Sequence, residues 1–440
     1  MRLAQHLGWL VVVVLLATPA SARAVGVAGD NAPEGAARAA AYAASFRSDM
    51  GLAADPTTIA EALSNPEAYS NIRYGTPLAP SEAKTVRDLI RAQNDLTGTA
   101  EAAARLPDFT STYFSAGTLH VLVTGDTVTA EAAIRPTVPP GRVVVVGQAQ
   151  VDNRTLVETA AAIGSDPDVA AIAVPTTVAI DPVTARVEAR FRPSDPLDDL
   201  TALLKKKFGN LVTVLTESAT GSAIACNSRD DCGTKGGLGA HHASPSVTCT
   251  TGFVSKVNGG TLHRILTAGH CINDAGGVTN SYPWKNYLGT LTWGLNADFL
   301  YTANEDIGTF WIGSTTTYNQ YFAGGTADIR TVRDTEASTA QMPVGRVVCV
   351  SGHTSGWGCG TIHRTNVSET YDGFIHYGLW EFTPLENFGD SGAGVVGLET
   401  DDSYVIPFGI AVSTGPTYTY FQPANEDSVV YTHVCTTAAC

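Results

Sequence analysis

Apolar positions change their spacing about half-way along the chain. In the first half, Val86, Leu89 and Ile90 recur at helical intervals within residues 81–93. Residues 36–44 are dense in alanine and closely follow a proline and a glutamate, as at the start of a helix. Both patterns predict α-helices.

Further along the first half, the interval shortens to that of β-strands. Residues 119–123 and 185–191 alternate, and residues 143–146 form a short β-branched run. A helical pattern over residues 200–208 is followed by a strand pattern over residues 211–215. We therefore expect a mixed α+β module.

The second half, from about residue 222, has a different pattern. Gly, Ser and Thr become frequent, long helical patterns disappear, and short apolar runs recur between turns. This predicts an all-β sandwich or barrel. The join, residues 217–223, is small and polar, as expected for an exposed processing site. The expected strands are residues 247–254, 262–267, 307–312, 346–350, 373–377 and 404–412.

The first 24 residues have the pattern of a secretory signal peptide. Arg2 precedes an unbroken apolar run over residues 10–17, and small residues that fit the A-x-A cleavage pattern follow. The run is too short to span a bilayer comfortably, which favours export over an uncleaved anchor. We therefore expect a secreted, extracellular protein. Its expected regions are a signal peptide (1–24), the α+β module (25–221) and the β-rich domain (222–440).

All eight cysteines lie in the second half. An even number in an exported chain predicts disulfides. The alternative, a zinc site, would need more closely spaced cysteines with histidine partners. The adjacent His241 and His242 would point apart on a strand with no third ligand close by, so we expect a surface or loop role and no metal.

The charge balance argues against a nucleic-acid partner. The formal net charge is −15, and no basic face is evident. The run Lys205-Lys206-Lys207 fits a solvated helix end. Hydrophobic residues make up 44% of the chain and charged residues 16%, which is enough apolar content for packed cores.

Three short motifs in the β-rich half contain catalytic residue types. They are Leu-Thr-Ala-Gly-His-Cys at residues 266–271, Asn-Glu-Asp-Ile-Gly at 304–308 and Gly-Asp-Ser-Gly-Ala-Gly at 389–394. Each has an ordinary structural explanation by itself, such as a tight turn. The last is the most specific, because glycines on both sides of Ser391 let the backbone turn sharply and free its N–H groups to face an oxyanion. The order His, Asp, Ser is that of chymotrypsin-type enzymes.

Residues 249–440 resemble the bacterial branch of the chymotrypsin-like serine peptidases, the streptogrisin and α-lytic type. Besides the catalytic motifs, the resemblance rests on residues 251–254, 348–360, 409–413 and 420–423. It implies an all-β catalytic domain of two antiparallel six-stranded β-barrels. The preceding α+β region resembles, more loosely, the pro-regions of this branch, which assist folding and inhibit the enzyme until they are removed.

The resemblance therefore implies a secreted serine endopeptidase that is made as a zymogen and hydrolyses polypeptides. Its own pro-region would act as an intramolecular chaperone and inhibitor. The enzyme would be a monomer without a cofactor or a nucleic-acid partner, and it would not contact a membrane after signal removal. An alternative from a different class is a secreted peptidase-like binding protein with little or no catalytic activity.

Carried over residue by residue, the resemblance assigns the catalytic roles. Ser391 would be the nucleophile, His270 the general base, and Asp306 the acid that orients the imidazole. Gly389 and Ser391 would donate the oxyanion N–H groups. Asp298 is a rival for the acid because it also precedes an apolar stretch, but the run after Asp306 fits better the buried strand that follows the aspartate in this branch.

The resemblance also implies two disulfides. Cys249–Cys271 would hold the histidine loop, and Cys349–Cys359 would close a loop of the second barrel. The remaining cysteines would form two short loops or pair across them, and the sequence leaves this open. They are Cys226, Cys232, Cys435 and Cys440.

The expected substrate pocket departs from the branch. Leu385 stands where relatives have a cysteine or, in trypsin-like enzymes, an aspartate, so we expect an uncharged substrate side chain and no pocket disulfide. Glu386 could supply charge, but a solvated loop carboxylate is the favoured interpretation. Phe388 is expected to lean over the site. The other expected pocket residues are Val412, Ser413 and Thr414.

Asp390, just before the nucleophile, lacks its usual partner. In relatives an arginine of the second-barrel loop is associated with this aspartate, but the position is Val350 here. Arg346 is a candidate substitute because residues 346 and 350 share a strand face. A buried carboxylate without any partner would be costly, so some partner is expected.

Overall fold

The computed structural model describes residues 32–216, 236–257, 262–287, 291–312, 319–323, 329–333, 337–384, 386–399, 403–415, 417–424 and 432–436. The predicted signal peptide, the join near residue 222, Leu385, and the cysteines Cys226, Cys232 and Cys440 lie outside these residues, and so does the pairing left open for Cys435. Among the described helices, none is long and apolar enough to cross a membrane.

Four helices open the N-terminal module. They are α1 (Ala32–Asp49), α2 (Pro56–Ser64), α3 (Pro80–Asp95) and α4 (Thr97–Ala104). One face of α3 is buried through Val86 and Ile90, as its apolar spacing predicts. The Glu82 carboxylate caps the start of α3 by accepting the Ala79 N–H at 3.0 Å. Both helices predicted for this part of the chain are confirmed.

Two sets of three strands complete this module: the first is a sheet of its own, and the second is the edge of a larger sheet. The first has the order β1 (Phe109–Ser115), β2 (Thr118–Val123) and β3 (Val144–Gln148), with α5 (Thr127–Ile134) between β2 and β3. The second contains β4 (Thr177–Asp181), β5 (Arg186–Phe191) and β6 (Val212–Thr216), with α8 (Leu197–Phe208) between β5 and β6. Helices α6 (Asn153–Ser165) and α7 (Pro167–Ile172) precede β4. The α+β prediction, including the strand and helix patterns of residues 119–215, is confirmed.

In the first part of the β-rich half, the described residues form a short helix, α9 (Gly269–Asp274), and, together with one strand from the end of the chain, two sheets. A three-stranded sheet has the order β11 (Trp284–Asn286), β7 (Gly239–Ala243) and β8 (Ser246–Thr250). A five-stranded sheet has the order β12 (Asn296–Tyr301), β13 (Asp306–Trp311), β10 (His263–Thr267), β9 (Val254–Val257) and β22 (Thr432–Val434).

The last part of the chain forms one large sheet. Its strands are β14 (Gln320–Phe322), β15 (Ile329–Val332), β16 (Val347–Gly352), β17 (Gly356–Tyr371), β18 (Phe374–Phe382), β19 (Gly394–Leu398), β20 (Tyr404–Thr414) and β21 (Thr419–Pro423). The all-β class predicted for this half is thereby confirmed. The count of six strands in each of two barrels stays a prediction.

One expected strand is divided. Residues 247–254 were expected to be continuous, but β8 ends at Thr250 and β9 begins at Val254. The chain bends between them, where Gly252 packs directly on the glycine-rich serine turn. A Cβ atom on Gly252 would lie 2.8 Å from the Gly392 carbonyl oxygen and 2.4 Å from the Ile410 side chain. The break therefore brings this segment against the turn that carries Ser391.

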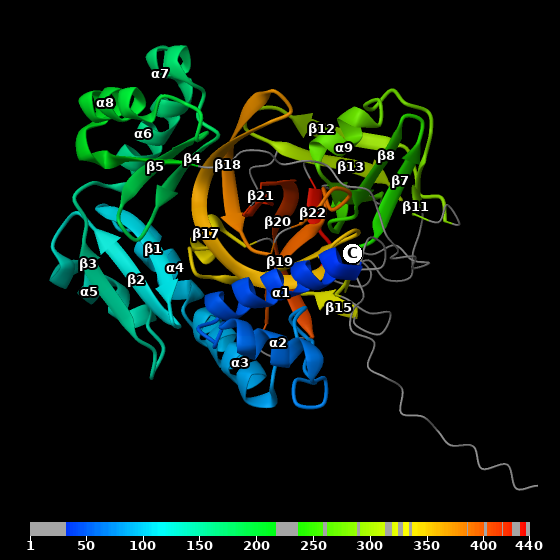
Figure 1. Cartoon of the computed structure of the whole chain (residues 1–440), viewed down its shortest axis with the longest axis horizontal. Coiled ribbons are helices and arrows are strands. Elements are labelled where there is room, and N and C mark those ends of the chain that lie inside the picture. Colours follow the sequence, from blue (N-terminus) through cyan, green and yellow to red (C-terminus); the bar gives the residue numbers. More distant parts are fainter. Residues whose placement is uncertain are drawn as a thin grey trace, which may run out of the picture.

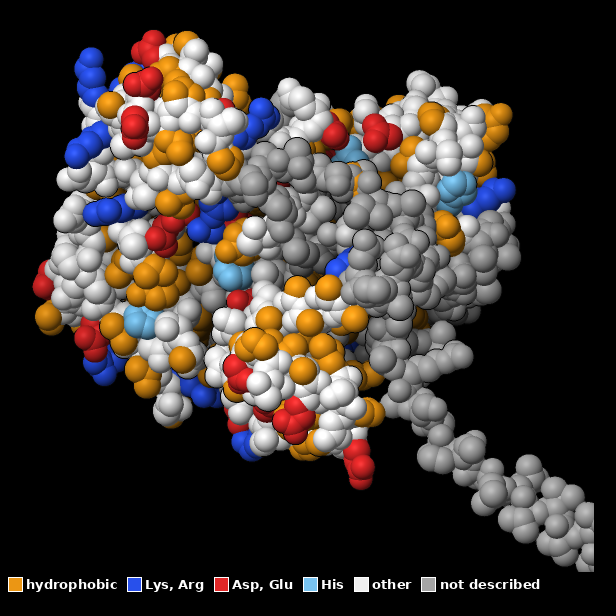
Figure 2. Space-filling model, in the orientation of Figure 1, with side chains coloured by type: hydrophobic (Ala, Val, Ile, Leu, Met, Phe, Trp, Pro, Cys, Tyr) orange, Lys and Arg blue, Asp and Glu red, His pale blue; other side chains and the backbone are white. Residues whose placement is uncertain are grey.

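The two halves of the chain share a sheet. Figure 1 shows the N-terminal module, in blue to green, lying against the long curved strand β17. Strand β4 of the module pairs antiparallel with β17, with Val178 opposite Ser368 and Ile180 opposite Thr365. This pairing places the N-terminal module beside the site described below. On the face in Figure 2, the Lys and Arg side chains of the described residues are interspersed with Asp and Glu.

Candidate active site

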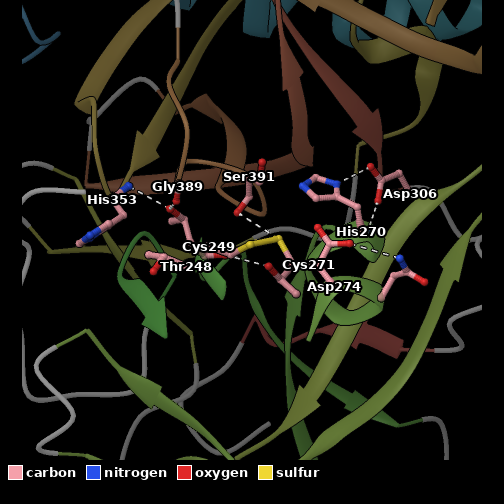
Figure 3. Close-up of a disulfide and its surroundings, with 12 residues drawn as sticks. Thr248, Cys249, His270, Cys271, Asp274, Asp306, His353, Gly389 and Ser391 are labelled. Atoms are coloured by element: carbon pink, nitrogen blue, oxygen red, sulfur yellow. Dashed lines mark hydrogen bonds and ion pairs between the residues drawn. A yellow bond between two sulfur atoms is a disulfide. The ribbon is translucent and has the colours of Figure 1, made fainter. Parts of the chain in front are cut away.

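His270 and Asp306 are brought together by the pairing of β10 with β13. His270 lies in the first turn of α9, directly after β10, and Asp306 is the first residue of β13. The His270 Nδ1 lies 2.8 Å from Asp306 Oδ2, and the His270 backbone N–H donates to Oδ1 at 2.8 Å (Figure 3). Gly269 permits this packing, because a Cβ atom there would lie 2.2 Å from the Leu300 carbonyl oxygen. Contact with the carboxylate favours the proton on Nδ1 and leaves Nε2 as a base.

Asp306 is fully buried (0% exposed), so its charge depends on the donors around it. Burial raises the pKa of its carboxyl group, but His270, with its charge and hydrogen bonds, outweighs burial and keeps the pKa below its usual value. A further donor is the Tyr371 hydroxyl, which lies 2.8 Å from Oδ2. The sequence gives no motif that points to Tyr371, because the contact spans 65 residues and depends on how the hairpin β17–β18 folds over the site.

Ser391 sits in a turn that only glycines allow. Gly389 has φ +88° and Gly392 has φ +91°, backbone angles that L side chains rarely adopt. A Cβ atom on Gly392 would also lie 2.0 Å from the Thr267 hydroxyl oxygen. The Thr250 N–H and hydroxyl fix the turn by donating to the carbonyls of Ser391 (2.8 Å) and Gly389 (2.7 Å). In Figure 3, Ser391 and the His270 ring lie side by side.

The turn leaves two backbone donors available. Among the described residues, no acceptor is hydrogen-bonded to the N–H of Gly389 or Ser391, so both can serve an oxyanion. Within the same part of the chain, no hydrogen bond joins Ser391 Oγ to His270. Such bonds often tighten only when substrate is bound.

A pocket of about 740 Å³ opens beside these residues. Both His270 and Ser391 line it, and so do the expected pocket residues Glu386, Phe388, Val412, Ser413 and Thr414. Residues 174–177 and Arg192 of the N-terminal module line the same pocket. A segment of the first half thus reaches the site that the second half builds.

Comparison with known proteins gives the family relationship. No family model matches the chain. Streptogrisin-C of Streptomyces griseus is 30% identical over 198 residues, which is 42% of this chain and 37% of that protein. Serine protease 1 of Streptomyces fradiae is 28% identical over 299 residues, 66% of this chain and 74% of that protein.

This chain is a homologue of streptogrisin-C and of serine protease 1. The match spans just over a third of the length of streptogrisin-C. Solved structures with similarity include a Cellulomonas bogoriensis chymotrypsin (27% identity, TM-score 0.35, 46% of this chain and 98% of that chain) and a Nocardiopsis protease (22%, 0.36, 45% and 95%). The predicted resemblance to the bacterial branch is confirmed by the named homologues.

In this serine protease homologue, Asp298 does not approach His270. Its side chain is 59% exposed and pairs with the Arg264 guanidinium, which itself stacks 4.1 Å over the Trp311 ring. The structure therefore brings Asp306, and not Asp298, into contact with the histidine. Cys249–Cys271 and Cys349–Cys359 are disulfide-bonded, so the first of these links the histidine turn to β8.

Two expectations about acidic residues of the protease homologue are wrong. Glu386 is not a solvated loop carboxylate: it is 5% exposed, and its backbone N–H donates to the Thr419 hydroxyl at 2.8 Å. Its Oε2 and the Asp390 Oδ1 would each lie 2.3 Å from a Cβ atom placed on Gly352, so the two carboxylates are close neighbours. The local sequence, a polar residue in a loop, does not reveal this burial.

Arg346 is not the partner of Asp390. Its guanidinium donates to the Asn94 side chain of the N-terminal module. Asp390 instead accepts backbone N–H groups of Thr354, Ser355 (3.1 Å) and Asn387 (2.7 Å). Burial raises the pKa of Asp390, and these donors oppose the rise. Backbone amides, and not Arg346, therefore stabilise the Asp390 carboxylate.

The histidine pair lies away from this pocket. His242 is fully buried on β7, where its ring nitrogens lie 3.0 Å from the Pro245 carbonyl oxygen and 2.9 Å from that of Tyr282. The expected surface role is therefore wrong for His242. His241 points the other way and contacts the Thr248 hydroxyl at 3.3 Å. No cluster of three or more metal-binding side chains is found among the described residues.

The His270–Asp306 pair predicts a pH dependence for any reaction in which His270 acts as a base. Burial disfavours the imidazolium, but the charge and hydrogen bond of Asp306 outweigh burial and raise the pKa of His270 above 6.5. A histidine that acts as a base must be neutral, so kcat/KM of such a reaction is expected to fall as the pH drops through this raised pKa. A pH profile of kcat/KM measures it. An acid limb whose pKa lies at or below the usual value for histidine would contradict the expectation.

Proposed function

We propose that the chain is a secreted serine endopeptidase, made as a zymogen, that hydrolyses peptide bonds through an acyl-enzyme on Ser391. The observation that carries the proposal is the buried, hydrogen-bonded His270–Asp306 pair on the wall of the pocket that also exposes Ser391. Its homology to serine proteases supports the same reaction.

The proposed steps use only groups of this site. Ser391 Oγ attacks the scissile carbonyl carbon while His270 Nε2 accepts its proton. The oxyanion accepts hydrogen bonds from the N–H groups of Gly389 and Ser391. His270 then gives the proton to the leaving amine, and the acyl-enzyme remains. A water molecule, deprotonated by His270, attacks the ester carbonyl and releases the acid and Ser391. Asp306 stays ionised throughout and stabilises the imidazolium.

The zymogen part of the proposal assigns residues 1–24 to a signal peptide, 25–221 to a pro-domain and 222–440 to the peptidase domain. Support comes from residues 174–177, which line the active-site pocket next to Ser391. Further support comes from α1, whose Tyr42 hydroxyl accepts the Cys359 N–H at 2.8 Å beside the second disulfide. A domain held in this way would restrict substrate entry until it is removed.

A buried ion network also joins the two proposed domains. Arg190 on β5 pairs with Glu381 on β18 at 3.0 Å, and Glu188 on β5 pairs with Arg364 on β17 at 2.7 Å. Arg364 also pairs with Glu381. Glu381 is 0% exposed and Arg190 is 6% exposed, so water does little to screen the charges.

Arg190→Met is therefore expected to destabilise the full-length chain by about 3 kcal/mol, because it removes one partner of a buried ion pair. Denaturant unfolding of the Ser391→Ala chain, which cannot process itself, measures the effect. Arg186→Met is the matched control, since Arg186 is an exposed residue of the same strand. Equal unfolding midpoints for the two variants would show that the network contributes nothing.

Peptide hydrolysis by the processed chain tests the proposed function. The wild-type protein should cleave peptides, lose this activity with a serine-directed phosphonate, and acquire a new N-terminus near residue 222. The Ser391→Ala chain should keep its longer N-terminus when produced alone. A processed N-terminus in Ser391→Ala would assign the processing to another protease. A folded, processed wild-type chain that neither cleaves peptides nor reacts with the phosphonate would favour the alternative, a peptidase-like binding protein.

We also propose an uncharged side chain as the preferred substrate residue at the pocket. The basis remains Leu385, which lies outside the described residues. Cleavage of a peptide library by the processed enzyme tests the preference directly. Predominant cleavage after lysine or arginine would refute it and would draw attention to the buried Glu386 beside the pocket.

A further inference from the structure

The hydroxyl of Tyr371 holds the carboxylate that orients His270. We propose that Tyr371 is a positioning residue for Asp306: its hydroxyl, 2.8 Å from Oδ2, fixes the carboxylate in the orientation that the imidazole needs. The inference rests on the proposed function, because it assigns a role within the same catalytic site.

Both oxygens of Asp306 are engaged, and Tyr371 acts on the one that matters for the imidazole. Oδ1 accepts the His270 backbone N–H, while Oδ2 is shared by the His270 Nδ1–H and the Tyr371 hydroxyl. The two bonds to Oδ2 come from different elements, α9 and β17. Rotation of the carboxylate would therefore break the bond to Tyr371 as well as the bond to the imidazole.

The neighbouring hydroxyl does not share this task. Ser413 lies on β20 and lines the same pocket, but its Oγ donates to the Glu369 carboxylate. Within the described residues, Tyr371 is the side-chain hydroxyl bonded to Asp306. Ser413 therefore donates to Glu369, two residues before Tyr371, and Tyr371 donates to Asp306.

The Tyr371 ring is held in place by stacking. It packs on His376 of β18 with ring centroids 3.7 Å apart and an interplanar angle of 7°. His376 is 1% exposed, and burial lowers its pKa to about 4, so the stacked imidazole stays neutral near pH 7. Burial and Asp306 raise the pKa of Tyr371, which keeps its hydroxyl protonated as a donor.

Strand β4 of the N-terminal module is hydrogen-bonded to the end of β17 that carries Tyr371. Thr177 pairs with Glu369, and the Thr370 N–H donates to the Thr176 carbonyl oxygen at 3.2 Å. The position of Tyr371 therefore has to be tested in the enzyme from which this module has been removed, where β17 lacks that neighbour.

Tyr371→Phe tests the proposal because it keeps the stacked ring and removes only the hydroxyl. In the processed enzyme we expect kcat about 10-fold lower with KM changed less than about twofold, since a hydrogen bond to a charged group is lost. Asp306 would then bear more unshared charge toward the imidazole. The pKa of His270 should rise, and the acid limb of kcat/KM should move to higher pH.

Tyr301→Phe is the matched control. The Tyr301 ring also lies near His270, with centroids 6.0 Å apart, but its hydroxyl donates to Asp372 at 2.7 Å. We expect kcat to stay within about twofold of wild type, and the acid limb of the kcat/KM profile to stay at the same pH. Besides Tyr371, the charged or titratable groups around His270 are Asp274, Asp306, Asp372, His376 and Tyr301. All of these are retained in Tyr371→Phe.

Three results would overturn the proposal: an unchanged kcat in Tyr371→Phe, a lower activity with no movement of the acid limb, or equal losses in Tyr371→Phe and Tyr301→Phe. Active-site titration with the phosphonate sets the enzyme concentrations. If Tyr371→Phe does not process itself, the hydrogen-bonded Nδ1 proton of His270 is observed by NMR in the full-length chains. Its resonance should shift in Tyr371→Phe and stay in place in Tyr301→Phe, and an unshifted resonance would again refute the role.

Different results would refute the proposed function and the positioning role. If wild-type enzyme neither hydrolyses peptides nor reacts with the phosphonate, the proposed function fails. If wild-type enzyme is active and Tyr371→Phe matches it, only the positioning role fails.

Discussion

Replacement of Ser391 by alanine is expected to lower kcat of the processed enzyme about 10⁶-fold. The variant loses the oxygen that forms the acyl-enzyme, and His270 and Asp306 have no nucleophile left to activate. The N–H groups of Gly389 and Ser391 remain, so a residual acceleration over water of about 10³-fold should survive. Initial rates on a peptide ester and a peptide amide measure the loss, with wild-type enzyme in trans supplying the processing.

Ser246→Ala is the control for this variant. Ser246 is an exposed serine of β8, a strand that ends against the serine turn, and its loss should change kcat by less than about twofold. Trace wild-type enzyme must be removed or blocked with the phosphonate before the assay. Hydrolysis by Ser391→Ala at more than about one-hundredth of the wild-type rate would be incompatible with an acyl-enzyme on this residue.

Asp306→Asn is expected to lower kcat about 10⁴-fold. An asparagine can present an N–H group toward His270 Nδ1, which favours the proton on Nε2 and removes the base from the side of Ser391. The negative charge that stabilises the imidazolium is lost as well. The acid limb of the pH profile should therefore move to lower pH in any activity that remains, opposite to the shift expected for Tyr371→Phe.

Asp298→Asn separates the two candidate acids of the sequence. The Asp298 side chain is largely exposed and contacts Arg264 and not His270, so kcat should stay within about twofold of wild type. A large loss in Asp298→Asn together with a small loss in Asp306→Asn would reverse the assignment and would contradict the geometry at His270.

Much of the site could be predicted because its parts are local in sequence. The glycines around Ser391 are needed within one turn, and the histidine motif combines a strand end with the first turn of α9. Such features depend on neighbouring residues, so the sequence displays them directly. The helix over α3 and the strand β5 were predictable for the same reason, since each carries its own apolar period.

The site contacts that the sequence did not predict join residues that are far apart in the chain. Tyr371 meets Asp306 across 65 residues, and Asp390 finds its donors at Thr354 and Ser355 on a loop more than 30 residues earlier. Glu386 is polar and lies in a loop, which suggests exposure, but the fold closes over it. Sequence periodicity carries no information about which loop meets which carboxylate.

The sequence also did not predict that the two halves of the chain share a sheet. Strand β4 has a sequence that fits many partners, and its choice of β17 depends on the position of the whole N-terminal module. The ion network around Glu381 shows the same limit, since its four residues come from β5, β17 and β18 and none is unusual in its own segment.

The most direct test of the account is the site of covalent labelling by a serine-directed phosphonate. The processed wild-type enzyme is treated with the reagent, digested with a second protease and sequenced by mass spectrometry. We expect one adduct, on the peptide containing Ser391. It should form at a rate that falls as His270 becomes protonated, and it should form negligibly in the Asp306→Asn variant. Active enzyme with no adduct on Ser391, or with the adduct on another serine, would contradict this expectation.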